Sequence, residues 1–124
     1  MATIAVLGTL DTKGVEHTFI ADEIRRRGHD ALLIDVGTGF PASTDHDIKR
    51  EVVASAAGLD MASISSGKDR GKCVSAMVKA APVFLEQLRK EGRIKGVISL
   101  GGGGGTAIAT AAMRALPVGF PKLM

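Results

Sequence analysis

Short apolar runs rich in β-branched residues recur along the chain and predict strands. Three of them are "TIAVLG" at 3–8, "ALLIDVG" at 31–37 and "IKGVISL" at 94–100. A fourth strand is predicted to begin at "FPKLM", residues 120–124. Each run is short, nearly free of charge in its centre and bounded by glycine or proline, which is typical of a buried strand.

Apolar residues at helical spacing separate the first three strands. The first stripe consists of Val15, Phe19, Ile20 and Ile24, and Gly28 ends the helix. The second stripe consists of Ile48, Val52, Val53 and Ala56, with Ser43, Thr44 or Asp45 as the expected N-cap. A long helix is predicted over 69–91, which Pro82 should kink or split.

The fourth helix, over 106–116, completes an order of strand, helix, strand, helices, strand, helix, strand. That order predicts an α/β fold, a Rossmann-like doubly wound parallel sheet with helices on both faces. The expected strand order is 2-1-3-4, which places the switch point between the first and third strands. The loops 8–14 and 100–106 should therefore meet at the carboxyl edge of the sheet, where such folds bind ligands.

Composition bounds the domain and its partners. The 124 residues suit one Rossmann-like nucleotide-binding domain or subdomain over 1–124. With no Trp, no Tyr, four Phe and a net charge of +3, the chain lacks the features of a nucleic-acid reader. One cysteine, no signal peptide and no long apolar span favour the cytoplasm and exclude a membrane span.

Five consecutive glycines follow the third strand and lead into a helix. The candidate phosphate-binding residues of this loop are Gly101, Gly102, Gly103, Gly104, Gly105 and Thr106. Bare amides at a helix N-terminus suit a phosphate or a carboxylate. The loop also fits the dinucleotide pattern G-x-G-x-x-G/A, but five glycines in a row fit many patterns. The alternative is a tight turn that lets helix and strand pack closely.

The loop after the first strand offers hydroxyls and a cation. Its candidate ligand-binding residues are Gly8, Thr9, Asp11, Thr12, Lys13 and Gly14. Asp11 has the wrong sign for a bare phosphate, so it either stabilises a helix N-terminus or holds a divalent metal against phosphate.

Several other polar residues have two interpretations each. Asp35, at the end of the second strand, binds ribose hydroxyls or caps the loop that follows. Arg70, with its neighbouring lysines, binds an anion or belongs to a solvated turn. The histidines 17, 29 and 46 lack the spacing of a metal site and are expected at the surface or at caps. Cys73 is expected to be a small buried residue.

Five motifs in order carry a resemblance to a known family. They are "GTLDTKG", "IDVG", "DRG", "LGGGGGTA" and "MRALPVGFPKLM". Together they resemble the Tm-one-like ATP-binding family across essentially the whole chain. The resemblance implies ATP binding in this region and association through it. Family members are longer, so the chain is similar to an N-terminal fragment of such a protein.

These observations together predict an ATP-binding domain, with Mg²⁺ as an optional companion of the nucleotide. No catalytic residue and no resident metal site is assigned. One alternative is part of an enzyme acting on a phosphorylated or carboxylated small molecule; another is a protein-interaction module.

The end of the chain predicts a homodimer or larger oligomer, because a last strand without a following helix leaves an edge and a face bare. The contact is expected within 107–124. It would use the small residues Ala107, Ala109, Ala111 and Ala112 together with Met113 and Leu116.

Overall fold

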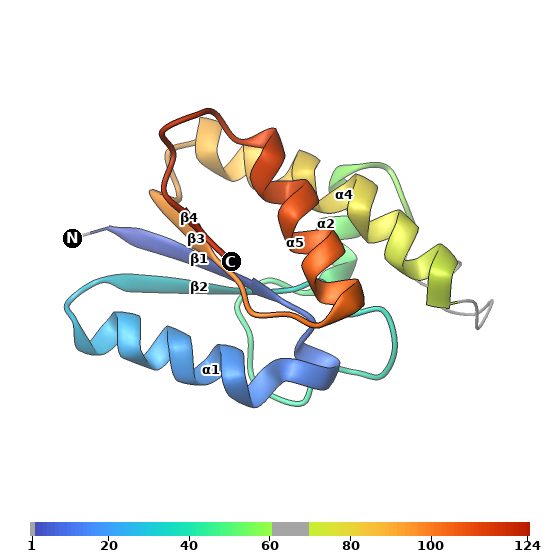
Figure 1. The fold of residues 1–124 in the computed structure, drawn as a ribbon, viewed down its shortest axis with the longest axis horizontal. Helices are drawn as coiled ribbons and strands as arrows, with labels where there is room; N and C mark the ends of the chain where they lie inside the picture. Colours follow the sequence, from blue (N-terminus) through green and yellow to red (C-terminus); the bar gives the residue numbers. More distant parts are fainter. Residues whose placement is uncertain (1, 61–69) are drawn as a thin grey trace.

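The four predicted strands form one parallel sheet. The computed structural model of the protein describes residues 2–60 and 70–124. The strands are β1 (Thr3–Gly8), β2 (Asp30–Asp35), β3 (Gly96–Ile98) and β4 (Lys122–Leu123). Their order is β2-β1-β3-β4 and all three pairings are parallel, which confirms the predicted fold class and topology (Figure 1).

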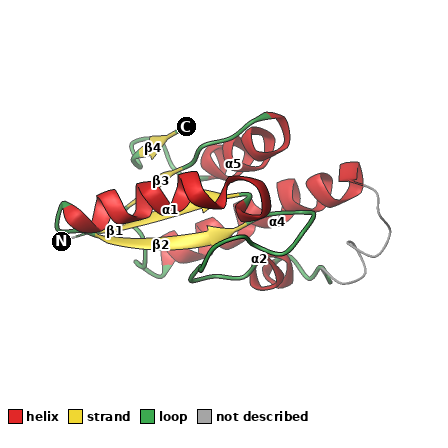
Figure 2. Ribbon diagram, turned by 90° about the horizontal axis from the view of Figure 1, so that it is seen from below, coloured by secondary structure: helices red, strands yellow, loops and turns green. Residues whose placement is uncertain are grey.

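Helices cover both faces of this sheet. The helices of the described residues are α1 (Leu10–Arg26), α2 (Arg50–Ala56), α4 (Arg70–Lys90) and α5 (Gly103–Ala115). α1 lies on one face, and α2, α4 and α5 lie on the other (Figures 1 and 2). The larger apolar core lies between the sheet and α2, α4 and α5. None of these helices combines the length and the apolar character that crossing a membrane requires.

α1 differs from its prediction in where it begins and which face it buries. It begins at Leu10, directly after β1, and has non-helical backbone angles at Lys13 (φ −124°, ψ 29°). Its buried residues are Leu10, Gly14, His17 and Ala21. Val15 and Phe19, predicted to face the core, are 72% and 64% exposed. The predicted stripe was therefore wrong at Val15 and Phe19, because Gly14, His17 and Ala21 occupy the face against the sheet in these turns.

α2 begins later than predicted, at Arg50, so residues 43–45 do not cap it. Ile48 instead forms a parallel bridge with Ile34 of β2, and the Asp35 amide donates to the Ile48 carbonyl at 3.0 Å. Pairing with the edge of β2 keeps this segment extended and postpones the helix.

α4 matches its predicted range to within one residue at each end, whereas α5 begins three residues earlier than predicted. α4 runs from Arg70 to Lys90 with Pro82 inside it, so the proline does not split the helix. α5 begins at Gly103, so three of the five glycines are helical instead of forming a loop.

Four residues of α5 and its C-cap that were predicted to contact a partner subunit are buried within the domain. Met113 and Leu116, expected to add apolar area to a subunit contact, are buried in the domain's own core, as are Ala109 and Ala112. They are thus unavailable to a partner in this fold. The open apolar surface near the C-terminus comes instead from Val118, Leu123 and Met124.

One row of register partners across the sheet shows where α1 no longer covers its face of the sheet. Leu33, Val6, Ile98 and Leu123 are register partners across β2, β1, β3 and β4, so their side chains share the α1 face. Leu33 and Val6 are buried with α1, whereas Leu123 is 63% exposed. The described part of the α1 face is therefore left open at β4.

Candidate functional site

A cleft of about 200 Å³ lies where β1 and β3 end, at the predicted switch point. It brings together residues from Thr9 and the start of α1, the loop after β2, the first turns of α5, and α4. The lining residues are Thr9, Asp11, Thr12, Lys13, Thr38, Val74, Gly102, Gly103, Gly104, Gly105 and Ile108. The two loops expected to meet thus form opposite walls of one cleft.

The glycines of the second wall serve two different purposes. None of residues 101–105 has a positive φ. A Cβ on Gly101 would lie 2.7 Å from the Thr106 amide nitrogen, so close packing requires glycine there. A Cβ on Gly102 or Gly103 would meet no atom within 4 Å. Gly102 is the N-cap of α5, a position where glycine is favoured over alanine, whereas the fold does not require glycine at 103.

The start of α5 presents an open, positive helix end. Gly102 occupies the N-cap and makes no side-chain cap, and the first turn contains no acidic residue. The amides of Gly103, Gly104 and Gly105 are among those for which an α-helix supplies no acceptor. Amides and helix dipole together favour an anion at this wall.

The first wall is the start of α1. The Thr9 carbonyl accepts hydrogen bonds from the Thr12 amide at 3.2 Å and the Lys13 amide at 2.8 Å. The Thr9 and Thr12 hydroxyls lie 3.1 Å apart. A Cβ on Gly105 would lie 3.5 Å from Thr9 Oγ1, so the two walls nearly touch at this point. Lys13 contributes the positive charge among the lining side chains.

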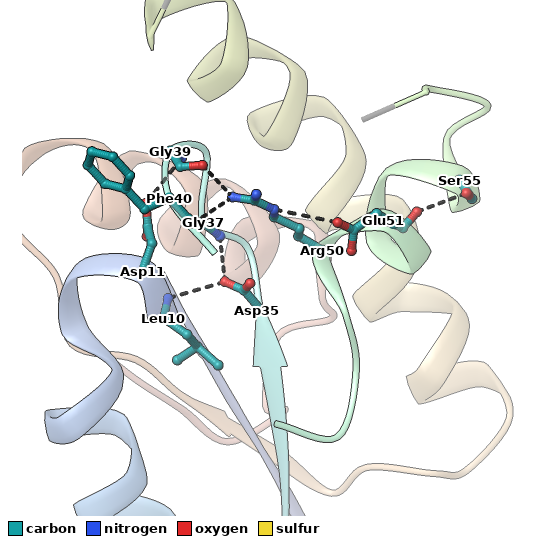
Figure 3. Close-up of polar contacts among 9 residues, drawn as sticks. All are labelled: Leu10, Asp11, Asp35, Gly37, Gly39, Phe40, Arg50, Glu51 and Ser55. Atoms are coloured by element: carbon teal, nitrogen blue, oxygen red, sulfur yellow. Dashed lines mark hydrogen bonds and ion pairs between the residues drawn. The ribbon is translucent and has the colours of Figure 1, made fainter. Parts of the chain in front are cut away.

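Asp11 holds the loop after β2 against the cleft. Its Oδ2 accepts a hydrogen bond from the Gly39 amide at 3.1 Å, and its Oδ1 is buried without a donor among the described residues. The same loop is held from its other side by Arg50, whose Nη1 donates to the carbonyls of Gly39 and Phe40 at 3.0 and 3.1 Å (Figure 3). Asp11 thereby positions a cleft-lining loop.

Asp35 is buried beneath that loop and is not among the cleft-lining residues. Its Oδ1 accepts from the Gly37 amide at 2.8 Å and from the Leu10 amide, the first of α1, at 3.2 Å (Figure 3). Burial raises the pKa of Asp35, although these two hydrogen bonds and the charges of Arg50 and His46 act to lower it. Of the two interpretations of Asp35, its contacts match the loop-capping one.

Two glycines of the first loop make room for side chains behind the cleft. A Cβ on Gly8 would lie 2.2 Å from the His17 ring, and one on Gly14 would lie 2.3 Å from Ser43 Oγ. Neither glycine lines the cleft, and the same holds for Gly101 and Thr106. Their described contacts are those of packing residues.

His17 was predicted to lie at the surface or at a cap; the surface placement is wrong, because the side chain is fully buried. Its Nδ1 lies 2.7 Å from the Lys13 carbonyl, and the Leu100 amide donates to its Nε2 at 3.2 Å. The residue therefore connects the two cleft walls. One feature of the sequence could have indicated the burial of His17. Gly8 ends a buried strand, and a glycine in a strand often marks a place where another group packs closely against the backbone.

Sequence reasoning also missed three lining residues. Thr38 follows a strand end, the same signal that pointed to Thr9, whereas Val74 and Ile108 have helical spacing that resembles ordinary core. Cys73 is buried, as predicted. Arg70 begins α4, but its side chain lies outside the described part of the structure.

Comparison with known proteins places these features in a family context. Residues 2–124 match the N-terminal domain of UPF0261, an uncharacterised protein family. A UPF0261 protein of Clostridium tetani is 46% identical over 121 residues, 98% of this chain and 30% of that protein. A UPF0261 protein of Rhizobium meliloti is 43% identical over 124 residues, 100% of this chain and 30% of that protein.

A plant protein is also similar. The ToMV resistance protein Tm-1 of Solanum lycopersicum is 31% identical over 133 residues, 95% of this chain and 18% of that protein. The chain therefore spans less than a third of the length of each of these three relatives.

Proposed function

The chain belongs to the uncharacterised protein family UPF0261, through its N-terminal domain, and from this premise we propose that it binds a nucleotide. The phosphates would enter the cleft between the start of α5 and the loop after β1. ATP is the first choice of nucleotide because of the resemblance to the Tm-one-like ATP-binding family.

The open space at Gly103, the first residue of α5, carries this proposal. Glycine loses more conformational freedom on folding than any other residue, so a helix whose first turn holds an unneeded glycine is less stable than one with alanine there. Neither a positive φ nor a steric clash accounts for Gly103. A ligand that approaches the backbone closely does account for it, because any side chain would occupy its place.

The chemistry of the walls suits a phosphate. Amides at the start of α5 would donate to the phosphate oxygens, and the Thr9 and Thr12 hydroxyls with Lys13 would close the opposite side. Asp11 opposes a bare phosphate, but a Mg²⁺ ion brought by the nucleotide would turn this carboxylate into a ligand, since Mg²⁺ is commonly held by one or two carboxylates together with phosphates.

The size of the cleft limits which part of the nucleotide it holds. Pockets that enclose a whole drug-sized ligand usually measure roughly 300–1,000 Å³, and this cleft measures about 200 Å³. We therefore place only the phosphate end inside it and the base beyond its rim.

Calorimetric titration and thermal melting with matched ligands test this proposal. ATP with Mg²⁺, inorganic tripolyphosphate and adenosine would be compared at equal concentrations. A ligand at about 100 times its Kd stabilises the fold by about 2.7 kcal/mol, a readily measured shift. We expect ATP to give the largest shift, tripolyphosphate a smaller one and adenosine the smallest. Absence of any shift with ATP at millimolar concentration, with no heat of binding, contradicts the proposal.

A further inference from the structure

We propose that His17 is a positioning residue that fixes the two walls of the cleft relative to each other, an inference that rests on the proposed nucleotide binding. The imidazole lies behind the cleft and is not among the residues that line it. Its role would be exerted through the backbone of the residues that do.

The two contacts of the ring allow one protonation state. The Lys13 carbonyl can only accept, so Nδ1 must carry the proton that it receives at 2.7 Å. The Leu100 amide can only donate, so Nε2 must be the unprotonated acceptor at 3.2 Å. The ring is therefore neutral, with its proton on Nδ1, and both nitrogens are occupied.

Each contact reaches one wall of the cleft. Lys13 lies in the first wall, at the point where α1 departs from helical geometry. Leu100 directly precedes the five glycines of the second wall. Lys13 lies near the start of α1, the helix that also carries His17, and Leu100 lies in the loop after β3, 83 residues from His17. One fully buried ring thus joins the start of α1 to the loop after β3, the two segments whose separation sets the width of the cleft.

Gly8 belongs to the same arrangement. A Cβ at this position would lie 2.2 Å from Nε2, 2.4 Å from Cε1 and 2.5 Å from Cδ2, so the ring rests directly on the end of β1. Gly8, the ring and the two loop contacts leave the imidazole little freedom to move. We infer that the separation of the cleft walls is built in before a ligand arrives, which reduces the ordering cost of binding.

Substitutions of His17 test this role. His17→Leu removes both hydrogen bonds but keeps an apolar side chain, whereas His17→Gln retains an acceptor that can reach the Leu100 amide. We expect the Kd for ATP with Mg²⁺ to rise about tenfold or more in the leucine variant. The glutamine variant should recover most of that loss. His29→Leu is the matched control, because His29 is exposed and lies at the opposite end of β2 from the cleft.

A second control separates positioning from general destabilisation. Leu88→Val weakens the buried core about 20 Å along α4 from Val74 and leaves the cleft intact. If the His17→Leu and Leu88→Val variants, at equal loss of melting temperature, lose affinity equally, or if His17→Leu binds as tightly as the wild type, the positioning role is wrong. If His17→Leu does not fold, Gly8→Ala replaces it, because the added methyl must displace the ring; unchanged ATP affinity in that variant also overturns the proposal.

A measurement without nucleotide distinguishes failure of this inference from failure of the proposed function. Nitrogen-15 NMR of the wild type should show the proton of His17 on Nδ1 and a slowly exchanging Leu100 amide. In His17→Leu that amide should exchange faster, and the resonances of residues 101–105 should shift. If the wild type binds no ATP but shows these signals, the proposed function fails while the connection between the walls stands. If the Leu100 amide exchanges equally fast in both proteins, the connection itself is refuted.

Discussion

Substitution of Gly103 separates what the fold needs from what a ligand needs. Gly103 is the first residue of α5, has no positive φ, and would carry a Cβ into space free of any atom within 4 Å. Alanine there should stabilise the free protein by about 0.5 kcal/mol, because it reduces the freedom of the unfolded chain. That gain corresponds to a rise in melting temperature of about 2 °C. Valine should leave stability nearly unchanged, because its poorer helix propensity offsets most of the same gain.

Nucleotide affinity should change in the opposite direction. A side chain at 103 would keep phosphate oxygens from the amides at the start of α5. Losing one hydrogen bond to a charged group costs about 1.5–3 kcal/mol, which weakens binding roughly tenfold to hundredfold. Gly103→Ala should therefore melt higher and bind ATP more weakly, and Gly103→Val should bind more weakly still.

The assay is thermal melting without ligand followed by calorimetric titration with ATP and Mg²⁺. Ala107→Val is the matched control, because Ala107 lies in the same helix, is exposed and does not line the cleft. We expect this control to lose about 0.5 kcal/mol of stability through helix propensity and to keep the wild-type Kd. A folded Gly103→Val variant that binds ATP as tightly as the wild type would refute phosphate binding at this loop.

Three further predictions concern specificity, pH and association. ATP should protect the domain from thermal unfolding more than NAD does, and stronger protection by NAD at equal concentration would reverse that ranking. Because burial raises the pKa of Asp35 above its ordinary 3.8, the folded state holds this proton more tightly than the unfolded state. The free energy of unfolding of the wild type should therefore fall relative to that of Asp35→Asn as pH rises from 3.8 through the raised pKa. Denaturant unfolding of both proteins from about pH 3 to about pH 7 measures this difference, and a difference that does not change with pH contradicts the reasoning. The domain should self-associate through the open region around Val118, Leu123 and Met124; a monomeric mass by light scattering at every concentration contradicts this, and Leu123→Lys should lower the measured mass.

Much of the site could be predicted because it depends on where strands end. The order of elements placed the loops after β1 and β3 side by side, and both loops do line one cleft. The roles within each loop could not be predicted in the same way. Gly101 and Gly103 look identical in sequence, yet the neighbouring backbone excludes a side chain only at Gly101.

Two residues show why the remainder required the structure. His17 was expected at the surface or at a cap because the histidines lack the spacing of a metal site, but a glycine at the end of β1 leaves space for its ring in the interior. Met113 was expected to be available to a partner because the strand after α5 ends the chain. It is buried because α5 packs along α4, and the relative placement of these two helices is not encoded in either segment alone.

Local chemistry in the sequence determined the strand positions, the parallel topology and the edge of the sheet where a ligand would bind. Apolar runs, helical spacing and right-handed crossovers suffice for these features, because each depends on periodicity and chain order alone. Tertiary structure decided which glycines pack and which face open space, which carboxylate caps a loop, and which histidine joins the walls of the cleft. Those outcomes depend on distances of a few ångströms between residues far apart in the chain, such as His17 and Leu100, and only the packed fold sets such distances.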